Sequence, residues 1–351
     1  MSNNWLFVAA VLTALGISQA AQAQVEGVYT IAHFEFESGA SLDRLKVGYI
    51  TYGTLNAEKS NAILLVPATS SGRRWAESQI GPGKAYDTDK YFFIGTDAIG
   101  AGTSSQPRDG LGPSFPAYTI RDMVRAEYEM VTSGLGLASL RAIAGPSMGS
   151  FQALEWGIHY PGFMRGLVLI VPTARNDQRF RAIADAVRAT ITLDPAFENG
   201  AYTTNPTEGL RRAGTIYFPW LYSDDYLRSL GTESAYQKEL WSFGDRWAQG
   251  WDADALLLRF EASRHHDVSI PFQGDMKRAL ASVKAQTILL VSATDKVAAA
   301  DLSRELKDGL KDAEWDVIPS SRGHLAGALP LPGSPEEAFL ALRIRSFLDR
   351  L

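Results

Sequence analysis

Short, unbroken runs of apolar residues recur along the chain and predict strands that are buried on both faces of a sheet. They are rich in Val, Ile and Leu, and the clearest lie at 62–67, 91–95, 140–144, 167–172, 287–293 and 314–318. Apolar and polar positions alternate instead over 31–37 and 45–54. This second pattern predicts an opening pair of strands.

Helical periodicity lies between several of these runs. Apolar residues spaced three and four apart predict helices over 120–135, 151–159, 298–310 and 336–348. The second of these stops at Pro161-Gly162, a typical helix terminator. Alternating strands and helices favour a doubly wound, mostly parallel α/β sheet.

One long interval, 173–286, lacks any comparable strand run and has mostly helical patterns. We interpret it as a helical cap inserted into a core of 24–172 and 287–351, over the sheet edge where such folds bind ligands. Many aromatic residues gather in it: Tyr217, Phe218, Trp220, Tyr222, Tyr226, Trp241, Phe243, Trp247 and Trp251. We expect most of them to form the cap's own core and only two or three to face a ligand.

The N-terminal segment 1–23 predicts a secretory signal peptide. An apolar run at 5–17 is followed by Ala21-Gln22-Ala23, small residues three apart that suit cleavage after Ala23. The run is too short to span a bilayer comfortably, so we expect a periplasmic or secreted mature chain without a membrane span. Residues 1–4 contain no Lys or Arg, which leaves an apolar N-terminus of a cytoplasmic protein as the alternative.

The amino-acid composition excludes several kinds of catalytic and binding site. The 351 residues include no Cys, which excludes disulfides, thiolate metal sites and Cys nucleophiles. The apolar and charged fractions, 46% and 21%, are ordinary for a globular protein. The net charge of −5 comes without a basic block, so no nucleic-acid partner is expected, and nothing in the sequence suggests a metal or a cofactor.

A candidate nucleophile lies in Gly145-Pro146-Ser147-Met148-Gly149, which matches the pattern G-x-S-x-G. The motif follows a predicted strand and precedes a predicted helix, the context in which such a serine projects from a sharp turn. The backbone N–H of Met148 then lies at the helix N-terminus, where an oxyanion would form. The alternative is a helix-capping Ser after a glycine-rich turn.

A serine nucleophile requires a base, and the base requires a carboxylate to orient it. Asp295 directly follows the predicted strand 287–293, and His324 follows the predicted strand 314–318. The order Ser, acid, His is that of the α/β-hydrolases. We therefore assign Ser147, Asp295 and His324 as a catalytic triad.

The remaining histidines are weaker candidates. His159 lies at the far end of the helix that follows the motif, so we interpret it as structural. The pair His265-His266 lies in the cap and remains a rival to His324. A second oxyanion donor is expected in the loop 66–72, from the N–H of Thr69 or of Ala68, although an ordinary polar turn is the alternative.

Four segments resemble the homoserine O-acetyltransferase-like branch of the α/β-hydrolase superfamily: 81–107, 145–170, 187–213 and 252–269. The resemblance implies an α/β-hydrolase fold with a helical lid, and the Ser-Asp-His triad on the residues assigned above. It also implies homodimer contacts through the cap.

The chain departs from that family where an amino acid substrate would bind. The resemblance implies a lid Arg at the position of Gly214, a Tyr near Leu221 or Tyr222, and an Asp at the position of Leu325. These losses remove charges that would grip a zwitterion. The remaining candidates for substrate contact are Tyr222, Leu325 and, if the helix register differs, Arg211 or Arg212. We therefore expect a divergent member that does not use homoserine.

Three functions stay open. The first is a secreted or periplasmic serine hydrolase that cleaves a small-molecule ester, thioester or amide through an acyl-enzyme. The alternative is an O-acyltransferase that uses an acyl-CoA or another acyl donor; an exported enzyme would not meet cytoplasmic acetyl-CoA. The third is a non-catalytic binding member of the fold.

Overall fold

A computed structural model of the chain describes residues 24–351, so the signal peptide expected at 1–23 lies outside the described residues. The strands are β1 (Val25–Glu35), β2 (Ser41–Tyr52), β3 (Ala62–Leu65), β4 (Phe92–Thr96), β5 (Leu140–Pro146), β6 (Met164–Ile170), β7 (Gln286–Val291) and β8 (Ala313–Val317). The helices are α1 (Ile120–Glu129), α2 (Met148–His159), α3 (Gln178–Thr192), α4 (Thr207–Leu221), α5 (Asp224–Ser229), α6 (Glu233–Gly250), α7 (Ala253–Arg264), α8 (Met276–Ala281), α9 (Ala300–Gly309), α10 (Leu325–Ala328) and α11 (Pro335–Arg350).

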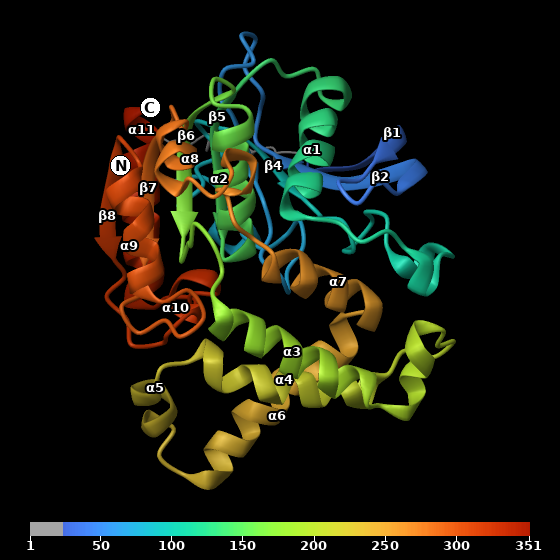
Figure 1. Cartoon of the computed structure of the whole chain (residues 1–351). Coiled ribbons are helices and arrows are strands. Elements are labelled where there is room, and N and C mark those ends of the chain that lie inside the picture. The colour runs from blue at the N-terminus through green and yellow to red at the C-terminus, as the bar shows by residue number, and fades with distance from the viewer. Residues whose placement is uncertain (1–23) are drawn as a thin grey trace, which may run out of the picture.

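The eight strands form one sheet in the order β1-β2-β4-β3-β5-β6-β7-β8. The first two pairs, β1 with β2 and β2 with β4, are antiparallel, and every later pair is parallel. Figure 1 shows the sheet with helices packed around it. The predicted architecture, a mostly parallel doubly wound α/β sheet, is confirmed.

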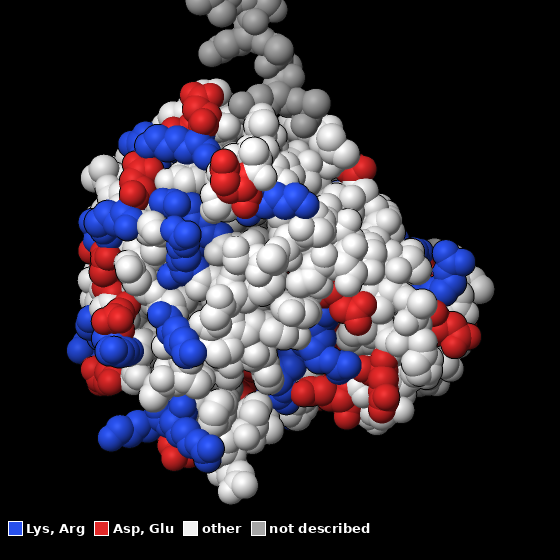
Figure 2. Space-filling model, turned by 90° about the horizontal axis from the view of Figure 1, so that it is seen from above, with Lys and Arg blue, Asp and Glu red and all other residues white. Residues whose placement is uncertain are grey.

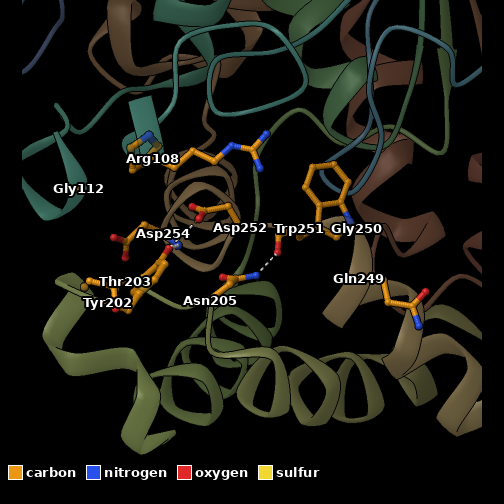
Figure 3. Close-up of a pocket in the computed structure, with 12 residues that line it drawn as sticks. Arg108, Gly112, Tyr202, Thr203, Asn205, Gln249, Gly250, Trp251, Asp252 and Asp254 are labelled. Atoms are coloured by element: carbon orange, nitrogen blue, oxygen red, sulfur yellow. Dashed lines mark hydrogen bonds between the residues drawn. The ribbon is translucent and has the colours of Figure 1, made fainter. Parts of the chain in front are cut away.

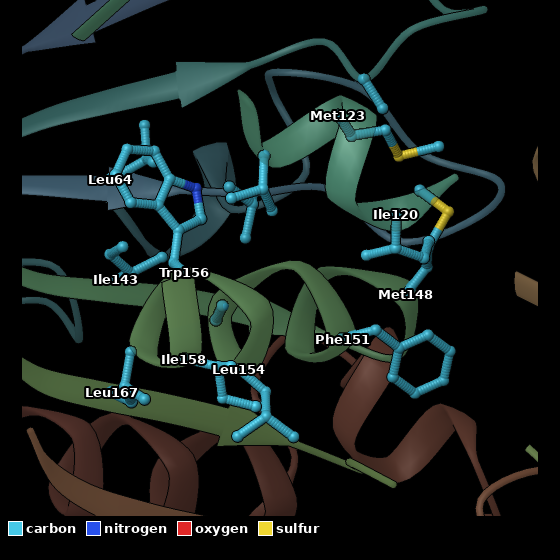
Figure 4. Packing of buried hydrophobic residues seen from close by; sticks show 14 of the residues in the cluster. Leu64, Ile120, Met123, Ile143, Met148, Phe151, Leu154, Trp156, Ile158 and Leu167 are labelled. Atoms are coloured by element: carbon cyan, nitrogen blue, oxygen red, sulfur yellow. The ribbon is translucent and has the colours of Figure 1, made fainter. Parts of the chain in front are cut away.

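The apolar runs are continuous because the central strands are covered on both faces. On β6, Leu167 and Leu169 pack into one core with α1 and α2, whereas Val168 and Ile170 pack into the other core with α11. Figure 4 shows the first of these cores, where Trp156 and its neighbours on α2 lie against the sheet. Successive strand residues point to opposite faces, so a strand buried on both sides needs an apolar residue at every position.

The chain between β6 and β7 builds most of a separate helical layer. In Figure 1, α3, α4, α5 and α6 lie together beyond one end of the sheet, with α7 between them and the core. Aromatic residues from these helices form their own core, which includes Phe218, Phe243, Trp247 and Phe260. This arrangement places the cap at the carboxyl ends of the parallel strands.

The predicted cap interval, 173–286, also contains α8, which packs with the sheet rather than with the cap. Ala279 and Leu280 of α8 are buried in the same core as Leu306 of α9. A short apolar helix shows the same sequence pattern whichever body it packs against, so the pattern could not place this boundary.

The surface agrees with the charge pattern of the sequence. On the face seen in Figure 2, blue and red side chains are interleaved, with uncharged surface between them. Within residues 24–351, no helix has both the length and the apolar character needed to cross a membrane.

Candidate active site

The strand–turn–helix motif holds Ser147 in a strained backbone conformation. Its φ is 54° and its ψ is −121°, a combination that residues other than glycine seldom adopt. The turn is tight enough to require glycine on both sides. A Cβ on Gly145 would lie 2.5 Å from the Gly149 carbonyl carbon, and one on Gly149 would lie 2.4 Å from the Val66 oxygen. Strain of this kind is typical of a side chain displayed for chemistry.

Ser147, His324 and Asp295 are brought together from three different elements. The Ser147 hydroxyl lies 2.9 Å from Nε2 of His324, and Nδ1 of His324 lies 2.7 Å from Oδ2 of Asp295. Because Nδ1 faces a carboxylate, it carries the proton, and Nε2 is left to accept from the serine hydroxyl. All three residues are buried.

The carboxylate of Asp295 is itself fixed. Its Oδ1 accepts hydrogen bonds from the backbone N–H groups of Val297 and Ala298, both at 2.8 Å. Its Oδ2 is therefore held toward His324. The structure brings these residues together because each follows a parallel strand, and the carboxyl ends of those strands meet at one edge of the sheet.

The two expected oxyanion donors flank the same serine. Met148 is the first residue of α2, so its N–H has no intrahelical acceptor. Thr69 and Ala68 line the cavity next to Ser147. Their loop is tied to α2 by Gln152, whose Nε2 donates to the Pro67 oxygen at 2.9 Å.

A cavity of about 200 Å³ opens over Ser147 and His324. Its cap wall is aromatic and comes from α4, α6 and the turn before α7: Tyr217, Phe243, Trp247 and Trp251. These are four of the nine cap aromatics, slightly more than the two or three that we expected to face a ligand. Phe243 and Trp247 are four residues apart on α6, so they share one helix face.

The cavity also contains Arg246, which sequence reasoning did not identify. It is the one Lys or Arg among the residues that line this cavity, and its side chain is exposed at the rim. Its Nη1 donates to Ser242 Oγ at 2.9 Å. The sequence does contain a pattern that could have indicated Arg246. It lies three positions after Phe243 in the same helix, so the two side chains lie on the same side of that helix.

Of the expected substrate contacts, only Leu325 lines this cavity. Arg211 and Arg212 do not, because their face of α4 is engaged in surface ion pairs. Arg211 pairs with Asp245 at 2.7 Å and with Glu208 at 2.8 Å, and Arg212 pairs with Glu208 at 2.7 Å. The register shift that would bring either one to the site is not present.

Tyr222 does not line the cavity either. Its ring stacks on Tyr226 with 4.5 Å between ring centroids and lies 4.8 Å from the ring of Phe218. It is buried in the aromatic core of the cap. We therefore interpret Tyr222 as a packing residue of the cap and not as a substrate contact.

At Gly214, where the resemblance implies an Arg, two cap helices cross closely. A Cβ there would lie 3.0 Å from the Gly244 Cα and 3.2 Å from Cγ of Trp247. Because α6 packs so closely against α4, the space that a long cationic side chain would need at position 214 is filled.

The rival histidines lie elsewhere. His266 is buried, stacks on Phe151 with 4.2 Å between ring centroids, and has its Nε2 3.2 Å from the Thr173 oxygen. Burial lowers the pKa of His266 and favours the neutral ring. His265 is exposed and pairs with Glu261. Neither ring is hydrogen-bonded to Ser147.

A second cavity, of about 410 Å³, adjoins the first through Trp251, which lines both. Figure 3 shows Arg108 reaching over it from the core side, and Tyr202, Asn205, Asp252 and Asp254 on the cap side. It does not contain the Ser147–His324 pair. Ser147 and His324 therefore line the smaller of these two cavities and not the larger.

Comparison with known proteins agrees with this geometry. Residues 61–326 match the family model described as the alpha/beta hydrolase fold. A homoserine O-succinyltransferase of Methylibium petroleiphilum is 31% identical over 336 residues, which cover 84% of this chain and 87% of that protein. The chain belongs to the α/β-hydrolase superfamily, in its homoserine acyltransferase-like branch.

Solved structures of similar α/β-hydrolases include both transferases and esterases. A homoserine O-acetyltransferase from Bacillus anthracis has a TM-score of 0.84 at 25% identity and covers 94% of this chain and 98% of its own. The acetyl esterase MekB has a TM-score of 0.88 at 28% identity and covers 93% of this chain and 97% of its own. The expected resemblance is confirmed, and membership of this branch supports an enzyme.

The sequence relatives of this α/β-hydrolase change the balance between the two catalytic hypotheses. Relatives at about 30% identity carry the name homoserine O-succinyltransferase. Together with the solved transferase, they support our alternative, an O-acyltransferase, better than the secreted hydrolase that we placed first.

Proposed function

We propose that this protein is an acyltransferase that carries the acyl group on Ser147. The observation that carries the proposal is the relay of two hydrogen bonds, from the Ser147 hydroxyl to Nε2 of His324 and from Nδ1 of His324 to Asp295. This arrangement matches the nucleophile, base and orienting carboxylate that acyl transfer requires.

The reaction follows from these positions. Oγ of Ser147 attacks the acyl carbon while its proton moves to Nε2 of His324. The N–H groups of Met148 and Thr69 donate to the oxyanion of the tetrahedral intermediate. The intermediate collapses, the bond to the leaving group breaks, and His324 gives its proton to that group.

The second half-reaction returns the enzyme to its starting state. The hydroxyl of an acceptor alcohol gives its proton to His324 as its oxygen attacks the acyl carbon. The bond between that carbon and Oγ of Ser147 then breaks, and His324 returns the proton to Ser147. Water in place of the alcohol makes the same sequence a hydrolysis.

Ester hydrolysis is the second candidate, and the surroundings of the cavity favour it. Close packing of Gly214 against Trp247, and Leu325 after the triad histidine, leave the cavity without the charges expected for holding homoserine. The aromatic wall suits a small, apolar acyl group. Without charges to hold homoserine, the acceptor is water or an alcohol other than homoserine.

Partitioning of the acyl group tests these two candidates. Purified protein is given p-nitrophenyl acetate, or acetyl-CoA, with and without a panel of alcohols that includes homoserine. Acetylated alcohol formed at the expense of acetate supports transfer, whereas acetate alone, whatever the alcohol, supports hydrolysis. A Ser147→Ala variant that keeps wild-type turnover would contradict both.

We also propose that residues 1–23 are removed on export. The support is the apolar run and the small residues before Gln24. N-terminal sequencing of the protein from the periplasm or the medium should begin at Gln24. A chain that keeps its N-terminus and stays in the cytoplasm would contradict export.

A further inference from the structure

Arg259 on α7 is among the most buried charged side chains of the protein. Its exposed fraction is 0%, and among the described residues no carboxylate forms an ion pair with its guanidinium. Burying a cation without a counter-ion is costly, so such a residue is seldom placed in a core for packing alone. The cation lies between the cap and the core, against the loop that carries Thr69.

The hydrogen bonds of Arg259 go to that loop. Its Nη2 donates to the Ala68 oxygen at 2.7 Å and to the Ser71 oxygen at 2.9 Å. Its Nε and Nη1 have no hydrogen-bond partner. The guanidinium lies 4.7 Å from the ring centroid of Trp251, which lines the catalytic cavity.

Donors on two residues hold the orientation of one peptide group: Nη2 of Arg259 and the Ser71 N–H, which donates to the same Ala68 oxygen at 3.2 Å. The Ala68 carbonyl and the Thr69 N–H belong to the same planar, trans unit, so they point in opposite directions. Because Arg259 binds the carbonyl oxygen, the Thr69 N–H must point away from Arg259. A cationic donor on the carbonyl also polarises the peptide and makes its N–H a stronger donor.

We propose that Arg259 is a positioning residue of the oxyanion hole: it is the charged donor that holds and polarises the Ala68–Thr69 peptide. The inference rests on the proposed function, in which the Thr69 N–H donates to the oxyanion. It deepens that function, because it makes a cap helix responsible for the geometry of a core loop. The cap is then needed for the chemistry as well as for binding the substrate.

Two substitutions test this role. Arg259→Met keeps the apolar stem and removes the charge and all donors, whereas Arg259→Lys keeps a charge without the planar fork. Arg264→Met is the matched control, because Arg264 lies on the same helix but pairs with Asp185 at the surface. For each variant, kcat and KM are measured with p-nitrophenyl acetate, alongside the melting temperature.

A second readout separates positioning from simple folding. A trifluoromethyl ketone forms a tetrahedral oxyanion on the serine, whereas the corresponding secondary alcohol binds without forming one. The loss of a single oxyanion donor costs about 10²- to 10³-fold in rate. We expect Arg259→Met to lower kcat/KM about 100-fold and Arg259→Lys about 10-fold. The inhibition constant of the ketone should rise by the same factors, while binding of the alcohol and the KM change less than about threefold.

Several outcomes would overturn the inference. One is a folded Arg259→Met protein with wild-type kcat/KM, and another is lost activity with unchanged affinity for the ketone, which would make the role structural. If Arg259→Met does not fold, Arg259→Lys is judged by the same two criteria. A wild-type protein that neither turns over the ester nor binds the ketone would instead contradict the proposed function itself.

Discussion

A buried carboxylate in the core predicts an unusual dependence of stability on pH. Glu127 on α1 is fully buried; its Oε2 accepts from Trp156 Nε1 at 2.9 Å and its Oε1 accepts from Thr96 Oγ1 at 3.2 Å. Burial raises the pKa of Glu127 from 4.5 to about 7, and the two hydrogen bonds only partly oppose it. The Glu127 carboxyl therefore ionises at a higher pH in the folded state than in the unfolded state.

The sign and the size of the effect follow from linkage. Well below pH 4.5 the group is neutral in both states and contributes nothing. As the pH rises from 4.5 to 7, the unfolded chain loses its proton first, so the folded protein loses stability until both states are ionised. The difference from 4.5 to about 7 corresponds to about 3 kcal/mol at pH 8, at about 1.4 kcal/mol for each pKa unit.

Glu127→Gln removes that penalty and keeps acceptor and donor groups for Trp156 and Thr96. For a chain of this length, about 3 kcal/mol corresponds to about 4 °C in melting temperature. We expect Glu127→Gln to melt about 4 °C above the wild type at pH 8 and about 1 °C above it at pH 5, measured by calorimetry. Glu129→Gln, an exposed neighbour on the same helix, is the control and should change little at either pH. A Glu127→Gln protein that is less stable than the wild type at pH 8, or whose gain does not vary with pH, would refute the reasoning.

Three further predictions concern the site and the cap. Asp295→Asn should lower kcat about 10⁴-fold with little change in KM, because the imidazolium loses its stabilising carboxylate; a loss below tenfold in an ester assay would argue against the relay. Trp247→Ala removes part of the aromatic wall, so kcat/KM for a hexanoate ester relative to acetate should rise at least about 10-fold, and an unchanged preference would place the acyl group elsewhere. Gly214→Arg should lower the melting temperature by about 1–4 °C, from about 1–3 kcal/mol of overpacking, without adding homoserine acylation. A variant that melts like the wild type and acylates homoserine would contradict the helix packing described above.

The core of the fold could be predicted because the apolar pattern of each central strand matches its burial on both faces of the sheet. Runs such as 62–67 and 167–172 are apolar at every position, and the structure covers both faces of those strands. The short helix at Met276–Ala281 shows where this logic stops. Its apolar residues required burial, but only long-range packing placed it with the sheet and not with the cap.

The same division applies to the site. Ser147, Asp295 and His324 each end or follow a parallel strand, so topology alone brings them to one edge. Arg246 and Arg259 reach the site from the inserted cap. Their positions depend on the angle at which the cap packs against the core, and no local sequence pattern predicts that angle. The sequence did contain an indication of Arg259. It lies within the apolar segment LLLRF, so burial of that helix segment also buries the charged side chain.

The most direct test of the account is the identity of the residue that takes up the acyl group. Labelling with a fluorophosphonate, followed by peptide mass spectrometry, should modify the wild-type protein on Ser147 and nowhere else. His324→Ala should label far more slowly, since Nε2 of His324 accepts the serine proton. A wild-type protein that stays unlabelled, or that carries the label on another residue, would contradict the claim that Ser147 is the nucleophile.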